Sequence, residues 1–224
     1  MLLSFNWLKK YLPLPPTTTP SDIAHRLTLS TVEVEGLNDL GKYLVGIVVG
    51  RIVTVEKHPN ADRLRVCTVD VGSEKLSIVC GGSNVAENML VAIAKIGAKV
   101  RWHGEGDPIV LEPATIRGVA SEGMICGADE IGLVDRFPKH DEKEIVDLTR
   151  LAIAPGTPLS GALGLDDVIF EIDNKALSNR PYLWGHYGIA REIAALYEIE
   201  LAPYATAPTG RGKGKDLTIN VQAT

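Results

Sequence analysis

Aromatic side chains and cysteines are scarce in this sequence of 224 residues. Aromatic residues make up 5% of the chain, so aliphatic side chains must fill most of the core. The three cysteines, an odd number without a C-x-x-C pair, do not suit the disulfide framework of a small secreted domain. We therefore expect reduced thiols and a cytoplasmic protein.

A surplus of positive charge is missing as well. The net charge is −5 and the isoelectric point is near 5.6, which argues against non-specific binding to duplex nucleic acid. No apolar run approaches the roughly 18 residues of a membrane span. Residues 1–16 also lack the charged and then apolar order of a signal peptide. We expect no membrane partner.

The usual signatures of catalysis and metal binding are absent too. No two of the five histidines have a metal-binding spacing such as H-E-x-x-H, and no G-x-x-x-x-G-K-[ST] loop occurs. Cys80 and Cys126 each precede a glycine at the expected end of a buried strand, where cysteine acts as a small apolar residue. The sequence therefore predicts no catalytic residue, no metal site and no cofactor in this segment.

Both ends of the chain carry helix and strand signals. Residues 6–12 predict a short helix, and Thr19 is the expected N-cap of a helix that starts at Pro20. A long helix is expected after residue 177, with Ser178 or Asn179 as its cap, Pro181 just inside it, and Ile189, Ile193 and Leu196 on one stripe. Residues 31–36, 168–173 and 217–221 have strand character, with a basic linker before the last of these.

Between these ends lie five β-rich runs separated by turn residues, at 45–58, 63–72, 75–82, 88–100 and 114–127. Short strands at this spacing predict a five-stranded barrel of the oligonucleotide/oligosaccharide-binding (OB) type. The expected fold class is α+β, because α/β patterning returns after about residue 150. The expected inward positions are Ile47, Val49, Leu64, Val66, Ile78, Val91 and Ile93.

The stretch KHPNADRLRV at 57–66 combines a turn with clustered cations. Pro59, Asn60 and Asp62 favour a turn between the first two barrel strands, and Arg63 and Arg65 are predicted to face outward on the second strand. Residues 41–150 nevertheless carry 14 basic and 16 acidic side chains. A solvated strand face and a modest single-stranded or RNA-loop site both remain open interpretations.

Several motifs together resemble the β subunit of bacterial phenylalanyl-tRNA synthetase. HPNADRLRVCTVDVG, IVCGGSNV, AIAKIGAKV and IRGVASEGMICGADEIGL are similar to the tRNA-binding OB domain of that family. SFNWLKKYL, VEVEG and FEIDNKALSNRPYLWGHYGIAREIAALY are similar to the segments on either side of it. One departure is Tyr182, where the family usually has an aspartate that could cap the helix or pair with Arg180.

The resemblance implies a non-catalytic N-terminal segment of a phenylalanine–tRNA ligase, with the five-stranded OB-type barrel inserted in a small α/β domain that both flanks form. It implies partners, namely tRNA and a separate α subunit in an α2β2 heterotetramer, and a catalytic site in that α subunit that uses ATP and Mg²⁺. Editing and anticodon contacts are implied in later β domains. The expected divisions are 1–40 and 151–203 for the α/β domain, 41–150 for the OB domain, and 204–224 for a linker and the start of a further domain.

Two alternatives stay open at this point: a stand-alone tRNA-binding OB protein, and an OB module that binds another protein without touching RNA. For the RNA-binding face of the family, the resemblance implies a set of contact residues. Asn60 could instead be only a turn former, Ser121 a loop hydrogen-bonder and Met124 a core residue. The full set is Lys57, Asn60, Arg63, Arg65, Arg117, Ser121 and Met124.

Overall fold

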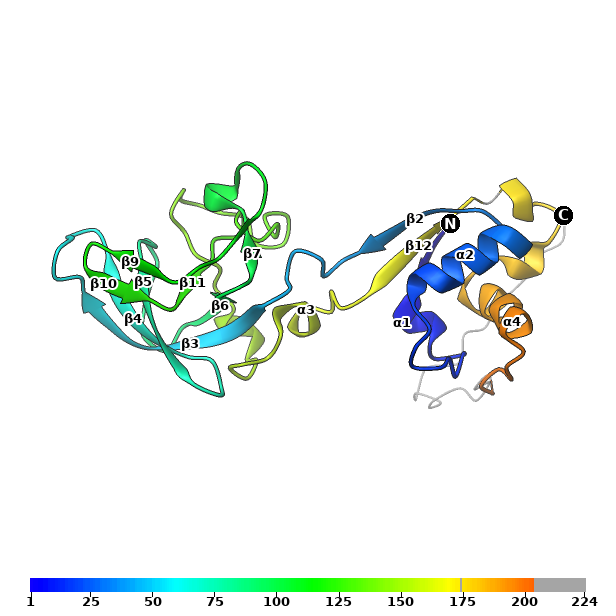
Figure 1. Cartoon of the computed structure of the whole chain (residues 1–224), viewed down its shortest axis with the longest axis horizontal. Coiled ribbons are helices and arrows are strands. Elements are labelled where there is room, and N and C mark those ends of the chain that lie inside the picture. The colour runs from blue at the N-terminus through cyan, green and yellow to red at the C-terminus, as the bar shows by residue number, and fades with distance from the viewer. Residues whose placement is uncertain (174, 204–224) are drawn as a thin grey trace, which may run out of the picture.

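Two bodies joined by a pair of antiparallel strands make up the chain (Figure 1). The computed structural model describes residues 1–173 and 175–203. The expected linker, the GRGKGK stretch and the strand at 217–221 lie outside these described residues. One body, here called the helical unit, contains both the N-terminal segment and the segment that ends the described chain. The other body is built from the middle of the sequence and is a β-barrel (Figure 1).

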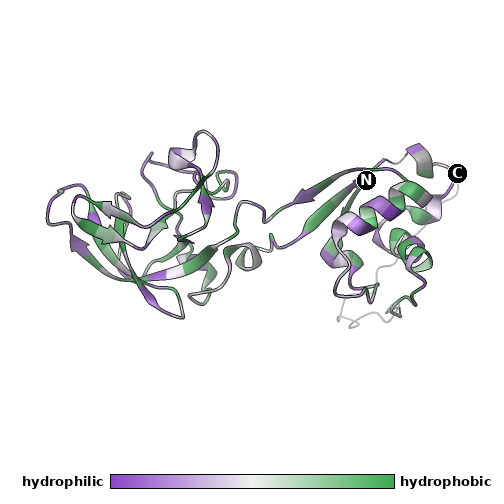
Figure 2. Ribbon diagram, in the orientation of Figure 1, coloured by the Kyte–Doolittle hydropathy of each residue, from purple (hydrophilic) through white to green (hydrophobic). Residues whose placement is uncertain are grey.

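The helical unit is built on a three-stranded antiparallel sheet in the order β1-β12-β2. These strands are β1 (Leu2–Ser4), β12 (Val168–Ile172) and β2 (Val34–Asp39), so residues about 165 positions apart become neighbours. The helices α1 (Phe5–Leu8), α2 (Pro20–Ser30) and α4 (His186–Tyr197) share one apolar core with the sheet. Figure 2 shows hydrophobic segments alternating with hydrophilic ones along these elements. The segments at the two ends of the chain thus form one core.

Helix α2 begins where the sequence predicts. The Thr19 hydroxyl accepts a hydrogen bond from the backbone N–H of Asp22, and the Asp22 carboxylate accepts one from the Thr19 N–H, which completes a capping box. Pro20 occupies the first turn, and Ile23 and Leu27 are buried on one face. Helix α1, by contrast, is only four residues long, shorter than the sequence suggests.

The predicted start of the long C-terminal helix is wrong. Pro181 opens a short 3-10 helix, η4 (Pro181–Leu183), which follows another, η3 (Lys175–Leu177). Helix α4 begins only at His186, because Gly185 has a φ of 99°, outside the helical region. Ile189 and Ile193 on its expected stripe are buried. The chain therefore forms two short 3-10 helices before α4, where the sequence pattern predicted a single long helix.

The barrel is a five-stranded antiparallel sheet in the order β11-β6-β3-β4-β5. Its long central strand is β3 (Ile47–Lys57), which pairs with β4 (Arg65–Asp70) on one side and β6 (Leu90–Lys95) on the other. The outer strands are β5 (Lys75–Cys80) and β11 (Gly123–Ile125). Glu122 N–H donates to the Ser77 carbonyl at 2.9 Å, which links the two edges and nearly closes the barrel. The predicted OB-type barrel is confirmed.

The inward positions are right on three strands and wrong at β4. Ile47, Val49, Ile78, Val91 and Ile93 are all buried, as predicted. On β4, however, Cys67 and Val69 fill the core, while Val66 and the preceding Leu64 are only half-buried. Side chains alternate along a strand, so choosing the wrong parity for this apolar run moved the whole set to the opposite face.

Smaller elements decorate the barrel between β6 and β12. Two hairpins follow β6: β7 (Lys99–Val100) with β8 (Ile109–Val110), and β9 (Ala114–Ile116) with β10 (Val119–Ser121). The 3-10 helix η1 (Trp102–Gly104) lies inside the first hairpin, and η2 (Thr149–Leu151) and α3 (Leu159–Ala162) follow β11. Leu159 of α3 packs in the barrel core.

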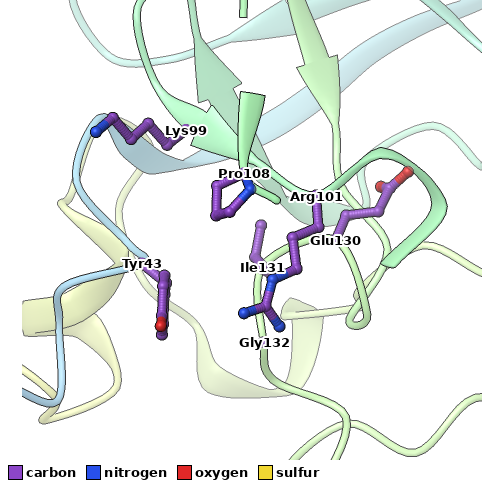
Figure 3. A pocket seen from close by; sticks show the side chains of 7 residues that line it. All are labelled: Tyr43, Lys99, Arg101, Pro108, Glu130, Ile131 and Gly132. Atoms are coloured by element: carbon purple, nitrogen blue, oxygen red, sulfur yellow. The ribbon is translucent and has the colours of Figure 1, made fainter. Parts of the chain in front are cut away.

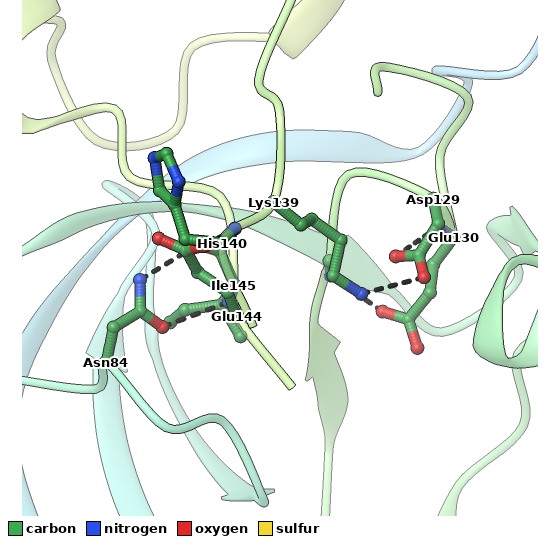
Figure 4. Close-up of polar contacts among 8 residues, drawn as sticks. Asn84, Asp129, Glu130, Lys139, His140, Glu144 and Ile145 are labelled. Carbon is green, nitrogen blue, oxygen red and sulfur yellow. Dashed lines mark hydrogen bonds and ion pairs between the residues drawn. The ribbon is translucent and has the colours of Figure 1, made fainter. Parts of the chain in front are cut away.

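Polar side chains fix the loop that follows β11 (Figure 4). Asn84 makes two hydrogen bonds of 3.0 Å with the backbone of Ile145, one as donor and one as acceptor. Lys139 pairs with Asp129 at 2.8 Å. The hydrogen bonds between the Asn84 amide and the backbone take the place of strand-to-strand hydrogen bonds. They hold this irregular segment against the barrel without a continuous β-ladder.

Candidate nucleic-acid interface

Cations meet at the turn between β3 and β4. Lys57, the last residue of β3, lies directly opposite Arg65, the first residue of β4, in the antiparallel register. Neither side chain belongs to an ion pair within residues 1–173 and 175–203. Like charges directly opposite each other weaken a pair of strands. By comparison, Arg51 lies opposite Asp70 farther along the same strands.

His58 stabilises this turn through hydrogen bonds of its imidazole ring. It is 5% exposed, and its Nδ1 accepts a hydrogen bond from the Asn60 N–H at 3.0 Å. Because Nδ1 is the acceptor, the proton lies on Nε2, which donates to the Ile116 carbonyl at 3.0 Å. His58 is therefore a structural residue that connects the β3–β4 turn to the β9–β10 hairpin.

The β9–β10 hairpin brings a further cation to the same place. Its two-residue loop consists of Arg117 and Gly118, with φ values of 48° and 89°, as a tight primed turn requires. Asn60 Nδ2 donates to the Arg117 carbonyl at 2.9 Å. The Arg117 side chain is exposed. The sequence pattern predicted one β-rich run here and no hairpin. The Arg-Gly pair between apolar residues was the available signal for its turn.

The structure therefore brings together five of the seven predicted contact residues. Lys57, Arg63 and Arg117 are exposed, and Arg65 is half-buried. The prediction of an outward pair on one strand is wrong, since Arg63 precedes β4 and Arg65 has the parity of the buried Cys67. Arg65 Nη1 donates to the carbonyls of Asp62 and Leu64, both at 3.2 Å, and so also stabilises the turn. We call Lys57, Arg63, Arg65 and Arg117 the turn surface.

The other two predicted residues are engaged in the protein itself. Ser121 is 5% exposed, and its hydroxyl accepts from the Val79 N–H at 3.1 Å and donates to the Gly123 carbonyl at 2.9 Å. It lies where the barrel closes. Met124 on β11 is half-buried and packs against the core.

The cysteines offer no nucleophile. Cys67, Cys80 and Cys126 are buried and unpaired. Burial raises the pKa of the Cys67 thiol to about 12, and burial also raises the pKa of Cys80 and of Cys126. Reactive cysteines need a lowered pKa, so these thiols act as small apolar side chains.

These raised pKa values predict how stability depends on pH. The folded state favours the neutral thiols, so its stability is unaffected well below the ordinary thiol pKa of 9.0. Above that value the unfolded chain gains thiolate, and the free energy of unfolding should fall steadily until the pH reaches about 12, the pKa of folded Cys67. Urea midpoints measured from mildly to strongly alkaline pH check this. Rapid labelling of native thiols by Ellman's reagent would contradict the burial.

Within the part of the chain that the structure describes, no group of three or more His, Cys, Asp or Glu side chains is arranged to hold a metal ion. Among the same residues, no helix is long and apolar enough to cross a bilayer.

Known proteins resemble this chain over most of its length. Residues 47–157 match the family described as putative tRNA binding domain. The phenylalanine–tRNA ligase β subunit of Synechococcus sp. (strain CC9902) is 40% identical over 203 residues, covering 90% of this chain and 24% of that protein. The same subunit of Latilactobacillus sakei subsp. sakei (strain 23K) is 39% identical over 197 residues, covering 88% and 23%. The chain thus spans about a quarter of the length of these curated relatives.

Among solved structures, the MetRS related protein from Pyrococcus horikoshii aligns with 50% of this chain and 85% of its own. The identity is 18% and the TM-score is 0.34, which is too low to add to the fold assignment.

Proposed function

Since this chain is homologous to the N-terminal region of phenylalanine–tRNA ligase β subunits and contains a tRNA-binding domain, we propose that its barrel contacts tRNA through the turn surface. Lys57, Arg63 and Arg117 would meet the phosphate backbone, because lysine and arginine bind phosphate by charge-assisted hydrogen bonds. Asn60, Arg65 and Ser121 would hold the two loops and the closed barrel edge in position. Met124 would support the face from the core.

The observation that carries this proposal is the pairing of Lys57 with Arg65 across β3 and β4. Two unneutralised cations in direct register reduce the stability of the free protein. A polyanion bound there would remove the repulsion. The adjacent exposed Arg63 and Arg117 extend the positive surface across both loops. The local cation cluster thus compensates for the slightly acidic balance of the barrel as a whole.

We further propose that the complete protein works with an α subunit in an α2β2 ligase that joins phenylalanine to tRNA. The relatives are named ligase β subunits, which supports a second kind of subunit. ATP and Mg²⁺ would act in the α subunit, outside this segment, and the segment would serve assembly and tRNA contact. The three unpaired thiols support a cytoplasmic location.

We also propose a division into two domains, with the barrel inserted near residue 41 and ending between residues 150 and 165. The separate cores support it: one joins Leu3 with Ile193 across the chain ends, and another joins Leu44 with Leu165 around the barrel. Residues 1–40 and the segment that starts with β12 would then fold together.

Replacing Lys57 and Arg63 together by alanine should weaken tRNA binding by roughly tenfold at low salt, because two phosphate contacts are lost. Both side chains are exposed, so the fold should not change. Fluorescence anisotropy with labelled tRNA, repeated at several salt concentrations, measures the affinity. The slope of log K against log salt should become shallower by about 1.4 to 1.8.

The matched control is Lys10→Ala with Arg191→Ala, which removes two exposed cations from the helical unit and should leave the affinity nearly unchanged. Equal losses in both double variants would mean that only net charge matters. If the unmodified protein binds tRNA without any dependence on salt, the turn surface is not the contact.

A further inference from the structure

A pocket beside β7 is lined by two cations, Lys99 and Arg101. The pocket is lined by residues from three segments, and Figure 3 shows their side chains: Tyr43, Lys99, Arg101, Pro108, Glu130, Ile131 and Gly132. The Arg101 guanidinium lies 5.2 Å from the centre of the Tyr43 ring, and the Lys42 ammonium lies 4.6 Å from the same centre. Both distances are within the range of cation–π contacts.

Arg101 differs from the other half-buried arginines of the described chain. Arg65 donates to two backbone carbonyls, and Arg180 donates to the Glu192 carboxylate at 3.0 Å. Arg101 has no such partner in residues 1–173 and 175–203, and its buried Nε forms no hydrogen bond. A buried guanidinium nitrogen without a partner costs free energy unless an external acceptor binds it.

Arg101 belongs to none of the ion pairs that the described residues form. The carboxylate of Glu130 points away from the Arg101 guanidinium and accepts from the Gly127 N–H at 2.7 Å (Figure 3). Burial also raises the pKa of Glu130. Lys42 and Lys99 belong to none of the ion pairs found among the described residues, and the nearby Glu105 and Asp107 do not line the pocket. Among the described residues, Lys42 and Arg101 therefore lie against Tyr43 without a carboxylate partner, and Lys99 lines the same pocket.

Two exposed aromatic residues directly follow cations of this group in the sequence. Trp102 follows Arg101, is 56% exposed and contacts the His103 ring edge-on, and Tyr43 follows Lys42 and is 41% exposed. Single-stranded nucleic acids are bound by this combination of basic side chains and open aromatic faces, because phosphates meet the charges while bases stack on the rings. An acidic peptide would need the charges but would leave the Trp102 face without a stacking partner.

We propose that Lys42, Tyr43, Lys99, Arg101 and Trp102, here called the β7 surface, bind a single-stranded stretch of RNA. Lys42, Lys99 and Arg101 contact its phosphates, and one base stacks on Trp102. This inference rests on the proposed tRNA contact and adds to it a second site, on the β7–β8 hairpin rather than at the β3–β4 turn. The barrel would then hold an RNA at two places, and a partly unpaired RNA would bind better than a uniform duplex.

The test uses the whole chain, labelled tRNA, and a 12-nucleotide single-stranded oligoribonucleotide as probes. Lys99→Gln combined with Arg101→Gln should weaken binding of both probes by roughly tenfold and make the salt slope shallower by about 1.4 to 1.8. Lys99→Glu alone, at an exposed position, should show the same direction if the double variant folds poorly. Both probes should quench tryptophan fluorescence, and Trp102→Leu should remove most of that quenching, with an affinity loss of roughly fivefold or more.

Lys10→Gln with Arg191→Gln is the control of equal charge change. If Lys57→Ala with Arg63→Ala weakens tRNA binding but the β7 variants do not, the β7 inference is overturned and the turn surface survives. The reverse pattern supports the β7 surface and removes the turn surface. Displacement of the labelled probes by polyglutamate but not by unlabelled single-stranded RNA would indicate a protein partner. Displacement of the probes by inorganic phosphate alone at millimolar concentration would indicate a free-anion site. Either result overturns the inference.

Discussion

Replacing Gly188 by alanine should destabilise the helical unit by about 3 kcal/mol, the largest effect that we expect from one added methyl group. Gly188 is buried in α4, and a Cβ there would overlap the Tyr182 carbonyl oxygen and lie 2.7 Å from the Leu183 Cα. These are backbone atoms of η4, so no side chain can rotate away. The turn must move off the helix, which opens the core around Leu183.

Gly161→Ala is the matched control, because Gly161 is also helical and its Cβ would meet nothing within 4 Å. That variant should be neutral or slightly more stable, since alanine is the better helix former. Thermal and urea unfolding followed by circular dichroism compare the two proteins. If Gly188→Ala unfolds within about 1 kcal/mol of the unmodified chain, η4 does not pack rigidly on α4.

Removing the His58 imidazole should have the second largest effect. His58→Ala leaves the Ile116 carbonyl and the Asn60 N–H, both at part-buried contacts, without their partners, and each lost hydrogen bond costs about 0.5–1.5 kcal/mol. We therefore expect the barrel to lose about 1–3 kcal/mol of its free energy of unfolding. The two loops of the turn surface would also separate, so tRNA affinity should drop at temperatures where the barrel is still folded.

His25→Ala controls for the loss of a histidine, because His25 is exposed on α2. It should change neither stability nor affinity. Amide hydrogen exchange at Asn60 offers an independent reading, since this N–H donates to the imidazole in the folded protein. An unchanged exchange rate in His58→Ala would show that the turn holds without the histidine.

Tyr182 illustrates how a local substitution is absorbed by distant residues. The resemblance placed an aspartate here, and the sequence offered no replacement for its charge. In the structure, Arg180 Nε donates to the Tyr182 hydroxyl at 2.7 Å, while its Nη2 pairs with Glu192 at 3.0 Å. Glu192 lies on α4, so only the folded structure shows that a carboxylate is still available to Arg180.

Local patterns predicted much of the architecture. The Thr19–Asp22 capping box follows from four adjacent residues, and the β-rich runs of the middle region correspond to the five barrel strands. These features were readable because they depend on neighbours in sequence. The prediction of the inward face of β4 failed for the opposite reason. Both faces of this strand carry apolar side chains, and only packing in the folded barrel decides which face is buried.

The sequence alone thus determined the α+β class, the barrel with its interrupted flanking unit, the family resemblance and the cations near KHPNADRLRV. Only the tertiary structure showed that Lys57 lies opposite Arg65, that His58 and Asn60 fasten that turn to Arg117, and that Lys42 and Arg101 meet over Tyr43. The physical reason is chain separation. Charges, hydrogen bonds and ring contacts act over a few ångströms, and residues 58 positions apart come that close only when the barrel has folded.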